Sequence, residues 1–225
     1  MRRSATLLHT FVFGLLLAAG SRPLSAAEPR PFQIEVGNLV YSMDQKTSVC
    51  FADAFLSTLA SRTHLPVATS FLKLKLSDEE LFRTPFCVFT GTGAFKLTDK
   101  ERANLRSYLH RGGFMVASPG CSNEPWNSAL LREIEGTFPD QKLEVIPMTH
   151  PIFSTIYKIP ALTLHHQGAN PMLRGLTIDG RLAFVFSPDG LNDTHHTVGC
   201  CCCGGNEINQ AEKVNVNLLM YALLY

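Results

Sequence analysis

Short apolar runs alternate along this chain with longer stretches in which apolar residues recur at helical spacing. Residues 32–41 alternate apolar and polar side chains, with Phe32, Ile34 and Val36 on one side, which indicates a β-strand. Four later segments are also predicted as strands, most of them apolar enough to be buried on both faces. They lie at residues 86–90, 114–117, 143–146 and 182–186.

Helical periodicity predicts the elements between these strands. In residues 48–62 the apolar side chains, among them Phe55 and Leu59, form one stripe. The sequence Thr-Asp-Lys-Glu at 98–101 is a capping box, and it opens a helix that ends at the glycine pair 112–113. A second capping box, Ser-Asp-Glu-Glu at 77–80, opens a shorter helix. Further helical segments are predicted at residues 126–138, 151–157 and 206–225.

Strands that alternate with helices are typical of a parallel sheet covered by helices. The sequence therefore predicts an α/β protein with a doubly wound, flavodoxin-like, mostly parallel sheet of five or six strands and helices on both faces. In such folds ligands bind at the carboxyl ends of the strands. Segments that follow different strands should consequently meet at one edge of the sheet.

The first residues have the three parts of a secretory signal peptide. Arg2 and Arg3 form a basic start, residues 11–19 are an apolar core, and small residues at 25–27 fit a cleavage site. We expect a signal peptide over residues 1–27, a single α/β domain over residues 28–225, and export to the periplasm or medium. The apolar core is short for a membrane span, so none is expected after cleavage.

The charge of the chain excludes one class of partner. Removal of residues 1–27 takes away Arg2, Arg3 and Arg22 and changes the formal net charge from +1 to −2. A nearly neutral domain without a basic stripe is not typical of nucleic-acid binding. The expected partner is an unidentified protein or small molecule.

Three segments with unusual chemistry follow predicted buried strands. The first is Thr-Gly-Thr-Gly at 90–93, the second is Ser-Pro-Gly-Cys-Ser-Asn at 118–123, and the third runs from Ser187 to Gly205. The third contains Asp193, adjacent histidines and four consecutive cysteines. All three are expected at the same edge of the sheet.

Thiolate and imidazole at one edge favour a soft metal site. Four consecutive cysteines cannot all point into a core, because neighbouring side chains point in different directions. Thiolate and imidazole ligands suit zinc or copper, which are the cofactors we consider. The candidate metal ligands are Cys121, Asp193, His195, His196, Cys200, Cys201, Cys202 and Cys203.

Two other interpretations of the same cysteines remain open. An exported protein works where disulfides form and persist, and Cys121 could pair with one cysteine of the run at 200–203. The run could also be a compact loop in which small side chains let backbone segments approach. Cys50 and Cys87 lie in apolar patterns and are predicted to be core residues.

Cys121 is also a candidate nucleophile, because it lies between a predicted strand and a predicted helix, as in a nucleophile elbow. His150 or His195 would then be the base. Pro119 and Pro125 fit the tight turn of an elbow poorly. A Cys121-dependent hydrolase or transferase is therefore the second hypothesis.

The mature chain resembles the bacterial family called domain of unknown function 4159. The pieces that carry the resemblance most clearly are Leu-x-x-Gly-Gly-Phe at 109–114 and His-Pro-Ile-Phe at 150–153. Other matching stretches lie at residues 36–41, 86–91, 105–109 and 215–218. The resemblance implies a fold like that of class I glutamine amidotransferases and no assigned activity. It does not imply glutaminase chemistry, because Pro119 and Asn123 replace the glycines that flank the cysteine in those enzymes and Ile152 replaces the acid after the histidine.

These observations together favour an exported, non-catalytic binding domain with a Cys/His metal or redox site at the carboxyl edge of its sheet. The alternatives are the Cys121 enzyme, with His150 as its partner, and a disulfide-stabilised interaction module. The sequence identifies no substrate for any of the three.

Overall fold

The computed structural model describes residues 32–47, 50–165, 170–192 and 207–225. The predicted signal peptide lies outside these residues, as do Asp193, the histidines at 195–196 and the cysteines at 200–203. Residues 32–225 form one compact unit. Among the described residues, no helix combines the length and the apolar character that crossing a bilayer requires.

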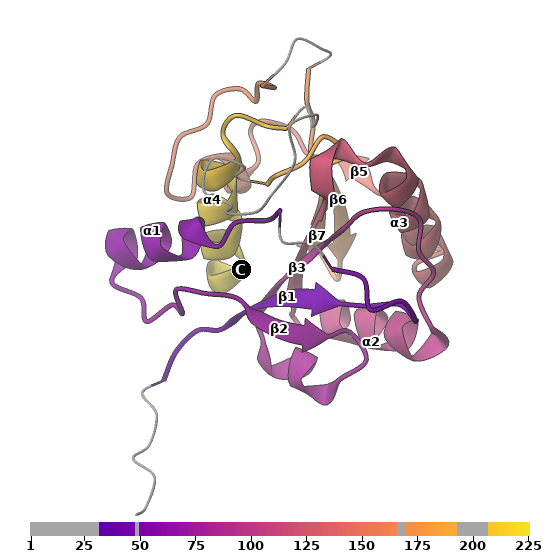
Figure 1. The fold of residues 1–225 in the computed structure, drawn as a ribbon. Coiled ribbons are helices and arrows are strands. Elements are labelled where there is room, and N and C mark those ends of the chain that lie inside the picture. The colour runs from indigo at the N-terminus through magenta and orange to yellow at the C-terminus, as the bar shows by residue number, and fades with distance from the viewer. Residues whose placement is uncertain (1–31, 48–49, 166–169, 193–206) are drawn as a thin grey trace, which may run out of the picture. The chain divides into compact units, whose positions relative to one another are not determined.

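A seven-stranded sheet runs through this unit in the order β2-β1-β3-β4-β7-β6-β5 (Figure 1). The five strands from β2 to β7 are parallel, whereas β6 runs antiparallel to β7, and β5 runs antiparallel to β6. The α/β class and the mostly parallel sheet are thus as predicted. The strands are β1 Val36–Val40, β2 Leu72–Lys75, β3 Phe86–Gly91, β4 Phe114–Pro119, β5 Glu144–Val145, β6 Arg174–Ile178 and β7 Arg181–Phe186.

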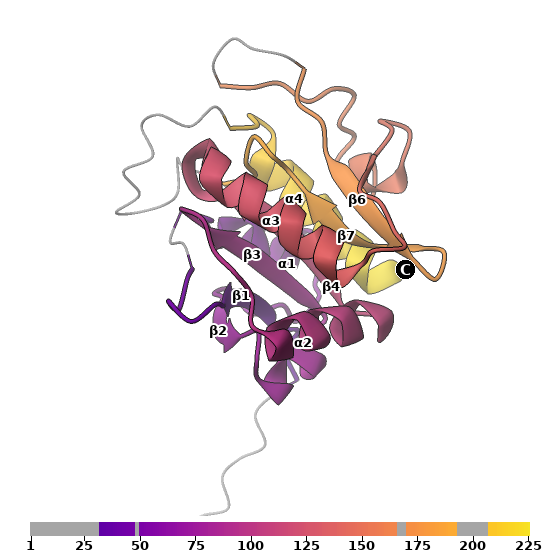
Figure 2. The same ribbon diagram turned by 90° about the vertical axis from the view of Figure 1, so that its right-hand side faces the viewer.

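Helices cover both faces of the sheet. Helices α1 and α4 lie on one face and helices α2 and α3 on the other (Figure 2). The α-helices are α1 Ala54–Thr63, α2 Asp99–His110, α3 Glu124–Thr137 and α4 Ala211–Leu224. The described residues also form the 3₁₀ turns η1 Glu79–Arg83, η2 Gly120–Ser122 and η3 Pro151–Phe153, which follow β2, β4 and β5.

Alternate residues of the central strands contribute to two hydrophobic cores, one on each face of the sheet. In β3, Phe86 and Val88 pack under α1 and α4, whereas Cys87 and Phe89 pack under α2 and α3. This alternation follows from the two-residue period of a strand. Because β3 and β4 are buried throughout, they fix the place where the segments after them emerge.

Several predicted boundaries need correction. The sheet has seven strands instead of five or six, because β2 and β6 were not predicted from the sequence. The first strand covers only Val36–Val40 of the predicted residues 32–41. The first helix begins at Ala54, and residues 50–53 before it are not helical. Helix α3 begins at Glu124, two residues before the predicted start, and α4 begins at Ala211 instead of residue 206.

One of the two predicted capping boxes is present. The Thr98 hydroxyl accepts a hydrogen bond from the Glu101 amide, and the Glu101 carboxylate accepts one from the Thr98 amide. These two hydrogen bonds give acceptors to two backbone amides that would otherwise have none at the start of α2. The predicted box at 77–80 is wrong, since η1 begins after Asp78, which makes no side-chain capping bond.

Candidate functional site at the carboxyl edge of the sheet

The described parts of the three unusual segments do meet at the carboxyl edge of the sheet. The backbone amide of Gly93, after β3, donates a 2.9 Å hydrogen bond to the side-chain oxygen of Asn123, after β4. The hydroxyl of Ser122 donates a 2.5 Å bond to the carbonyl of Asp189, after β7. These bonds connect the ends of three strands into one site.

Cys121 lies at the centre of this junction in an unusual backbone conformation. Its φ of 56° and ψ of 42° are left-handed, and Ser122 next to it also has a positive φ, 50°. Such a conformation costs a residue with a side chain about 1–2 kcal/mol. Surrounding contacts must therefore hold the turn between β4 and α3 in place.

Side chains from both sides hold that turn. The Asn192 amide donates a 2.7 Å hydrogen bond to the Pro119 carbonyl, directly before the turn. Asn123, directly after it, caps α3 by accepting a bond from the amide of Trp126. The turn that carries Cys121 is thus fixed at its start and at its end.

The segment after β7 is held by amide side chains as well. Asn127 of α3 donates a 2.8 Å hydrogen bond to the Pro188 carbonyl, and Asn215 of α4 donates a 2.9 Å bond to the Leu191 carbonyl. The Leu191 amide in turn donates to the Ser118 hydroxyl at the end of β4. Helices on both faces of the sheet therefore anchor the same segment.

An aromatic cluster packs beneath the segment at residues 90–93, which ends β3. The indole N–H of Trp126 donates a 2.5 Å hydrogen bond to the Tyr41 hydroxyl, which donates a 3.1 Å bond to the Thr90 carbonyl. Burial raises the pKa of Tyr41, so this phenol stays neutral and acts as a structural donor and acceptor. Gly91 allows the arrangement, because a Cβ atom there would lie 2.2 Å from the Tyr41 hydroxyl.

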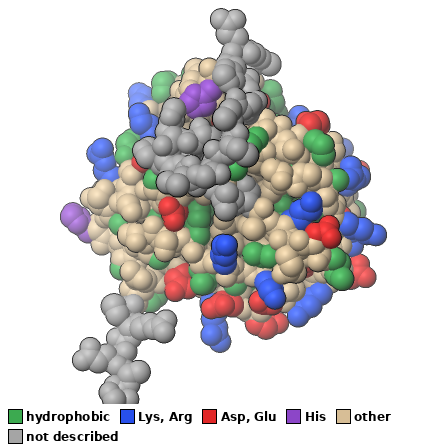
Figure 3. Space-filling model, viewed as in Figure 1, with side chains coloured by type: hydrophobic (Ala, Val, Ile, Leu, Met, Phe, Trp, Pro, Cys, Tyr) green, Lys and Arg blue, Asp and Glu red, His purple; other side chains and the backbone are tan. Residues whose placement is uncertain are grey.

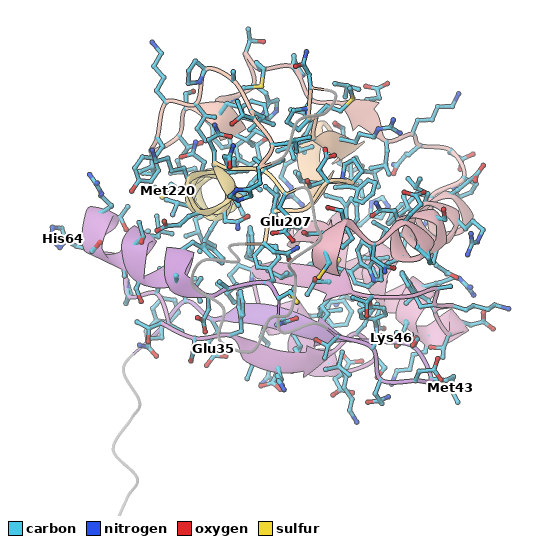
Figure 4. All side chains as sticks on the ribbon, turned by 45° about the horizontal axis from the view of Figure 1, so that its top comes forward. Glu35, Met43, Lys46, His64, Glu207 and Met220 are labelled. Carbon is cyan, nitrogen blue, oxygen red and sulfur yellow. The ribbon has the colours of Figure 1, made fainter. Side chains whose placement is uncertain are left out.

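Two carboxyl groups lie near the Cys121 turn. Burial raises the pKa of Asp189, whose carbonyl accepts the Ser122 bond. Glu207 is buried before α4 and accepts a 2.9 Å bond from Asn192, the residue that also holds Pro119 (Figure 4). The edge therefore combines the sulfur of Cys121 with two carboxyl groups that burial removes partly or fully from water.

Cys121 is the one predicted metal ligand that lies within the described residues. Cys121 takes part in an interaction and is not a free thiol. The described residues contain no group of three or more His, Cys, Asp and Glu side chains that could hold a metal ion. The other predicted ligands, Asp193, His195, His196, Cys200, Cys201, Cys202 and Cys203, lie outside the described residues.

His150, the predicted base of the alternative enzyme, is not brought near Cys121. Its ring lies 5.4 Å from that of Tyr221, and the Tyr221 ring lies 5.9 Å from that of Phe114, the first residue of β4. Cys121 follows the opposite end of the same strand, whose six residues span about 17 Å. Burial lowers the pKa of His150, and its Nδ1 accepts a hydrogen bond from the Ile152 amide as the cap of η3.

Cys50 and Cys87 are buried and form no disulfide, in agreement with their prediction as core residues. Burial raises the pKa of the Cys87 thiol to about 12. We expect iodoacetamide at pH 8 to leave Cys87 unmodified in the native protein and to alkylate it once the chain is unfolded, because only the thiolate reacts. Peptide mass spectrometry after a timed labelling pulse measures this. Native labelling of Cys87 as fast as that of an exposed cysteine would contradict its burial.

The sequence analysis missed the asparagines that organise the edge. Asn123 could have been found, since an asparagine two residues before a proline is a helix-start signal. The roles of Asn127 and Asn192 leave no such local pattern, because their acceptors are backbone carbonyls more than sixty residues away. On the face shown in Figure 3, Lys and Arg side chains lie among Asp and Glu side chains.

The chain matches the model of a known protein family. The family model described as Domain of unknown function (DUF4159) matches residues 37–223, and this range covers the described strands and helices except the first residue of β1 and the last residue of α4. No curated protein matches the chain.

Proposed function

Because the chain belongs to the DUF4159 family, whose description assigns no activity, we propose from the site itself that the protein is a non-catalytic binding domain. Its binding site is the carboxyl edge of the sheet, and Cys121 is the residue around which the site is built. The protein works after export, since residues 1–27 have the pattern of a signal peptide.

The observation that carries this proposal is the conformation of Cys121. A left-handed cysteine is unfavourable, and the Cys121 turn is nevertheless held by Asn192 before it and Asn123 after it. Strained residues of this kind concentrate at functional sites, where the surrounding structure over-determines them. The location agrees, because ligands of open α/β sheets bind beyond the carboxyl ends of the strands.

The strand order supports a flavodoxin-like arrangement around the proposed site. The parallel strands follow the order β2-β1-β3-β4-β7, which corresponds to the 2-1-3-4-5 order of flavodoxin-like proteins. In that arrangement the order reverses between β1 and β3, so the crevice lies beside Tyr41, which follows β1, and Gly91, which ends β3. We therefore propose a doubly wound, flavodoxin-like arrangement in which the Cys121 turn borders the ligand crevice.

The partners of Cys121 in this proposal come from the segment after β7. Asn192 holds the start of that segment against Pro119, two residues before Cys121. The residues that follow Asn192 in the sequence include Asp193, His195, His196 and Cys200–Cys203. With Cys121 they could hold zinc or copper, whose soft-ligand chemistry suits thiolate and imidazole. Without metal, Cys121 would pair with one of the four cysteines in an oxidising compartment.

A second function receives support from the same turn. A left-handed nucleophile between a strand and a helix is the geometry of a nucleophile elbow, which keeps the Cys121 hydrolase or transferase as the alternative. His150 cannot be its base, since it lies at the other edge of the sheet. His195 remains the candidate base from the sequence and lies outside the described residues.

The proposal predicts that Cys121 is engaged in the protein isolated after export without reducing agents. Elemental analysis should find about one zinc or copper ion per chain, in line with a single tetrahedral site. If the disulfide forms instead, non-reducing peptide mass spectrometry should link the Cys121 peptide to the peptide that contains residues 200–203. Cys121→Ser should abolish the metal or the link, whereas Cys50→Ala, which replaces a buried cysteine that forms no disulfide, should retain it.

One result would exclude the proposed site. Suppose that metal-free protein, fully alkylated at Cys121 in its native state, kept its structure and still bound its partner. Cys121 would then have no role in binding. Turnover of an ester or amide substrate that Cys121→Ser alone removes would instead favour the alternative enzyme.

A further inference from the structure

A second site lies at the opposite, amino-end edge of the sheet and does not depend on the function proposed above. A half-open cavity of about 240 Å³ lies between the segment before β3 and the glycine turn before β4, and its two arginine side chains are exposed to solvent. Its lining residues are Phe82, Arg83, Thr84, Pro85, Tyr108, Arg111, Gly112 and Gly113. Two of these side chains are cationic, and none is acidic.

The two guanidinium groups of this cavity are available to a ligand. Among the described residues, the ion pairs involve Arg102 and His110, and neither Arg83 nor Arg111 takes part in one. Arg111 stacks over the ring of Phe82, with its central carbon 4.9 Å from the ring centroid. Stacking fixes the plane of a guanidinium and leaves the N–H groups at its rim free to donate.

The other donors around the cavity are already used. The Tyr108 hydroxyl is shared between the carbonyls of Thr84 and Phe114, at 2.9 and 3.1 Å. The amides of Gly112 and Gly113 donate to carbonyls of the last turn of α2. Recognition in this cavity therefore depends on the guanidinium groups and not on a nest of backbone amides.

A third arginine adds positive charge and rigidity beside the cavity. Arg181 donates hydrogen bonds of 3.1 and 2.9 Å to the carbonyls of Leu109 and Gly113. Asp179, in the turn between β6 and β7, lies 3.1 Å from His110 and does not line the cavity. The exposed Glu79 and Glu80 lie at the start of η1 and do not line the cavity.

We propose that this cavity binds a phosphate group through Arg83 and Arg111. Two guanidinium groups without an acidic neighbour in the lining match the charge of a phosphate monoester, which carries about −1.5 to −2 at neutral pH. Planar guanidinium groups bind phosphate oxygens in pairs, with greater strength than neutral donors. At about 240 Å³ the cavity is smaller than the roughly 300–1,000 Å³ of sites for drug-sized molecules, so it fits the phosphate group of a small ligand.

Inorganic phosphate is the probe that tests this site. In a titration of the full mature domain, the backbone amide resonances of Gly112 and Gly113 should shift in a saturable way with phosphate. Chloride at the same ionic strength should not shift them, and acetate, with one charge, should bind more weakly. Arg83→Gln and Arg111→Gln should each weaken phosphate binding about tenfold, because each removes a charge-assisted pair of bonds.

Matched variants separate a specific site from general charge effects. Arg132→Gln removes an exposed arginine of α3 that does not line the cavity and should leave the phosphate affinity unchanged. Arg83→Lys keeps the charge but loses the planar fork and should weaken binding less than Arg83→Gln. Equal shifts with chloride, or equal weakening by Arg132→Gln, would overturn the proposal. Thermal unfolding of each variant confirms that the fold is intact.

Discussion

Trp126→Ala should lower the free energy of unfolding by about 3–5 kcal/mol, the range for removal of a large aromatic side chain from a core. Trp126 is fully buried, and its ring packs against Phe89 and Phe95 with centroid distances of 5.8 and 5.7 Å. The substitution also removes the N–H that donates to Tyr41. Denaturant unfolding followed by far-UV circular dichroism measures the change, since the variant lacks the single tryptophan of the chain.

Trp126→Phe separates packing from hydrogen bonding in this prediction. It retains an aromatic ring between Phe89 and Phe95 but removes the indole N–H. The Tyr41 hydroxyl would still donate to the Thr90 carbonyl, so only one hydrogen bond is lost. We expect a loss of about 1–3 kcal/mol, the cost of a buried polar group left without one partner. Equal losses for the Phe and Ala variants would show that ring packing is not the main contribution.

The elements with a strong local signal were predictable from the sequence. Strands β3 and β4 are continuous apolar runs, and α2 combines a capping box with a glycine pair after its end. In each case the local pattern and the tertiary environment favour the same structure. That agreement explains why the centre of the sheet was predicted correctly.

The two missed strands had weaker but recognisable signals. Strand β2 reads Leu-Lys-Leu-Lys, an alternation with lysine that suits the edge of a sheet. Strands β6 and β7 are joined at Asp179-Gly180, and both residues have positive φ, as a two-residue hairpin turn requires. The dipeptide Asp-Gly between apolar runs is a hairpin signal that could have identified β6.

The candidate site could be predicted in outline but not in detail. The rule that parallel strands end at one edge was enough to bring Gly93, Asn123 and Asp189 together. It could not give the left-handed conformation of Cys121, which depends on bonds from distant residues. It also could not distinguish metal from disulfide, because both require the same residues at the same edge.

Gly113→Ala should destabilise the protein by about 1–3 kcal/mol, the usual cost of adding a methyl group where no space exists. A Cβ atom at Gly113 would lie 2.4 Å from two carbons of the Tyr108 ring. That ring cannot move aside easily, because it is buried and its hydroxyl is bonded to the Thr84 and Phe114 carbonyls. The midpoint of urea unfolding measures this loss. The comparison with the unsubstituted domain requires that the unfolding free energy falls with urea concentration at the same slope in both proteins.

Gly136→Ala is the matched control for this substitution. Gly136 lies inside α3, and an added Cβ there would have no heavy atom within 4 Å. Alanine should therefore stabilise the protein by about 0.5–1 kcal/mol, since glycine is the weaker helix former. The same substitution should therefore change the free energy of unfolding in opposite directions at the two positions. Contact with Tyr108 causes the loss at Gly113, and helix propensity causes the gain at Gly136. A Gly113→Ala variant as stable as Gly136→Ala would mean that Tyr108 does not occupy the space beside the glycine turn.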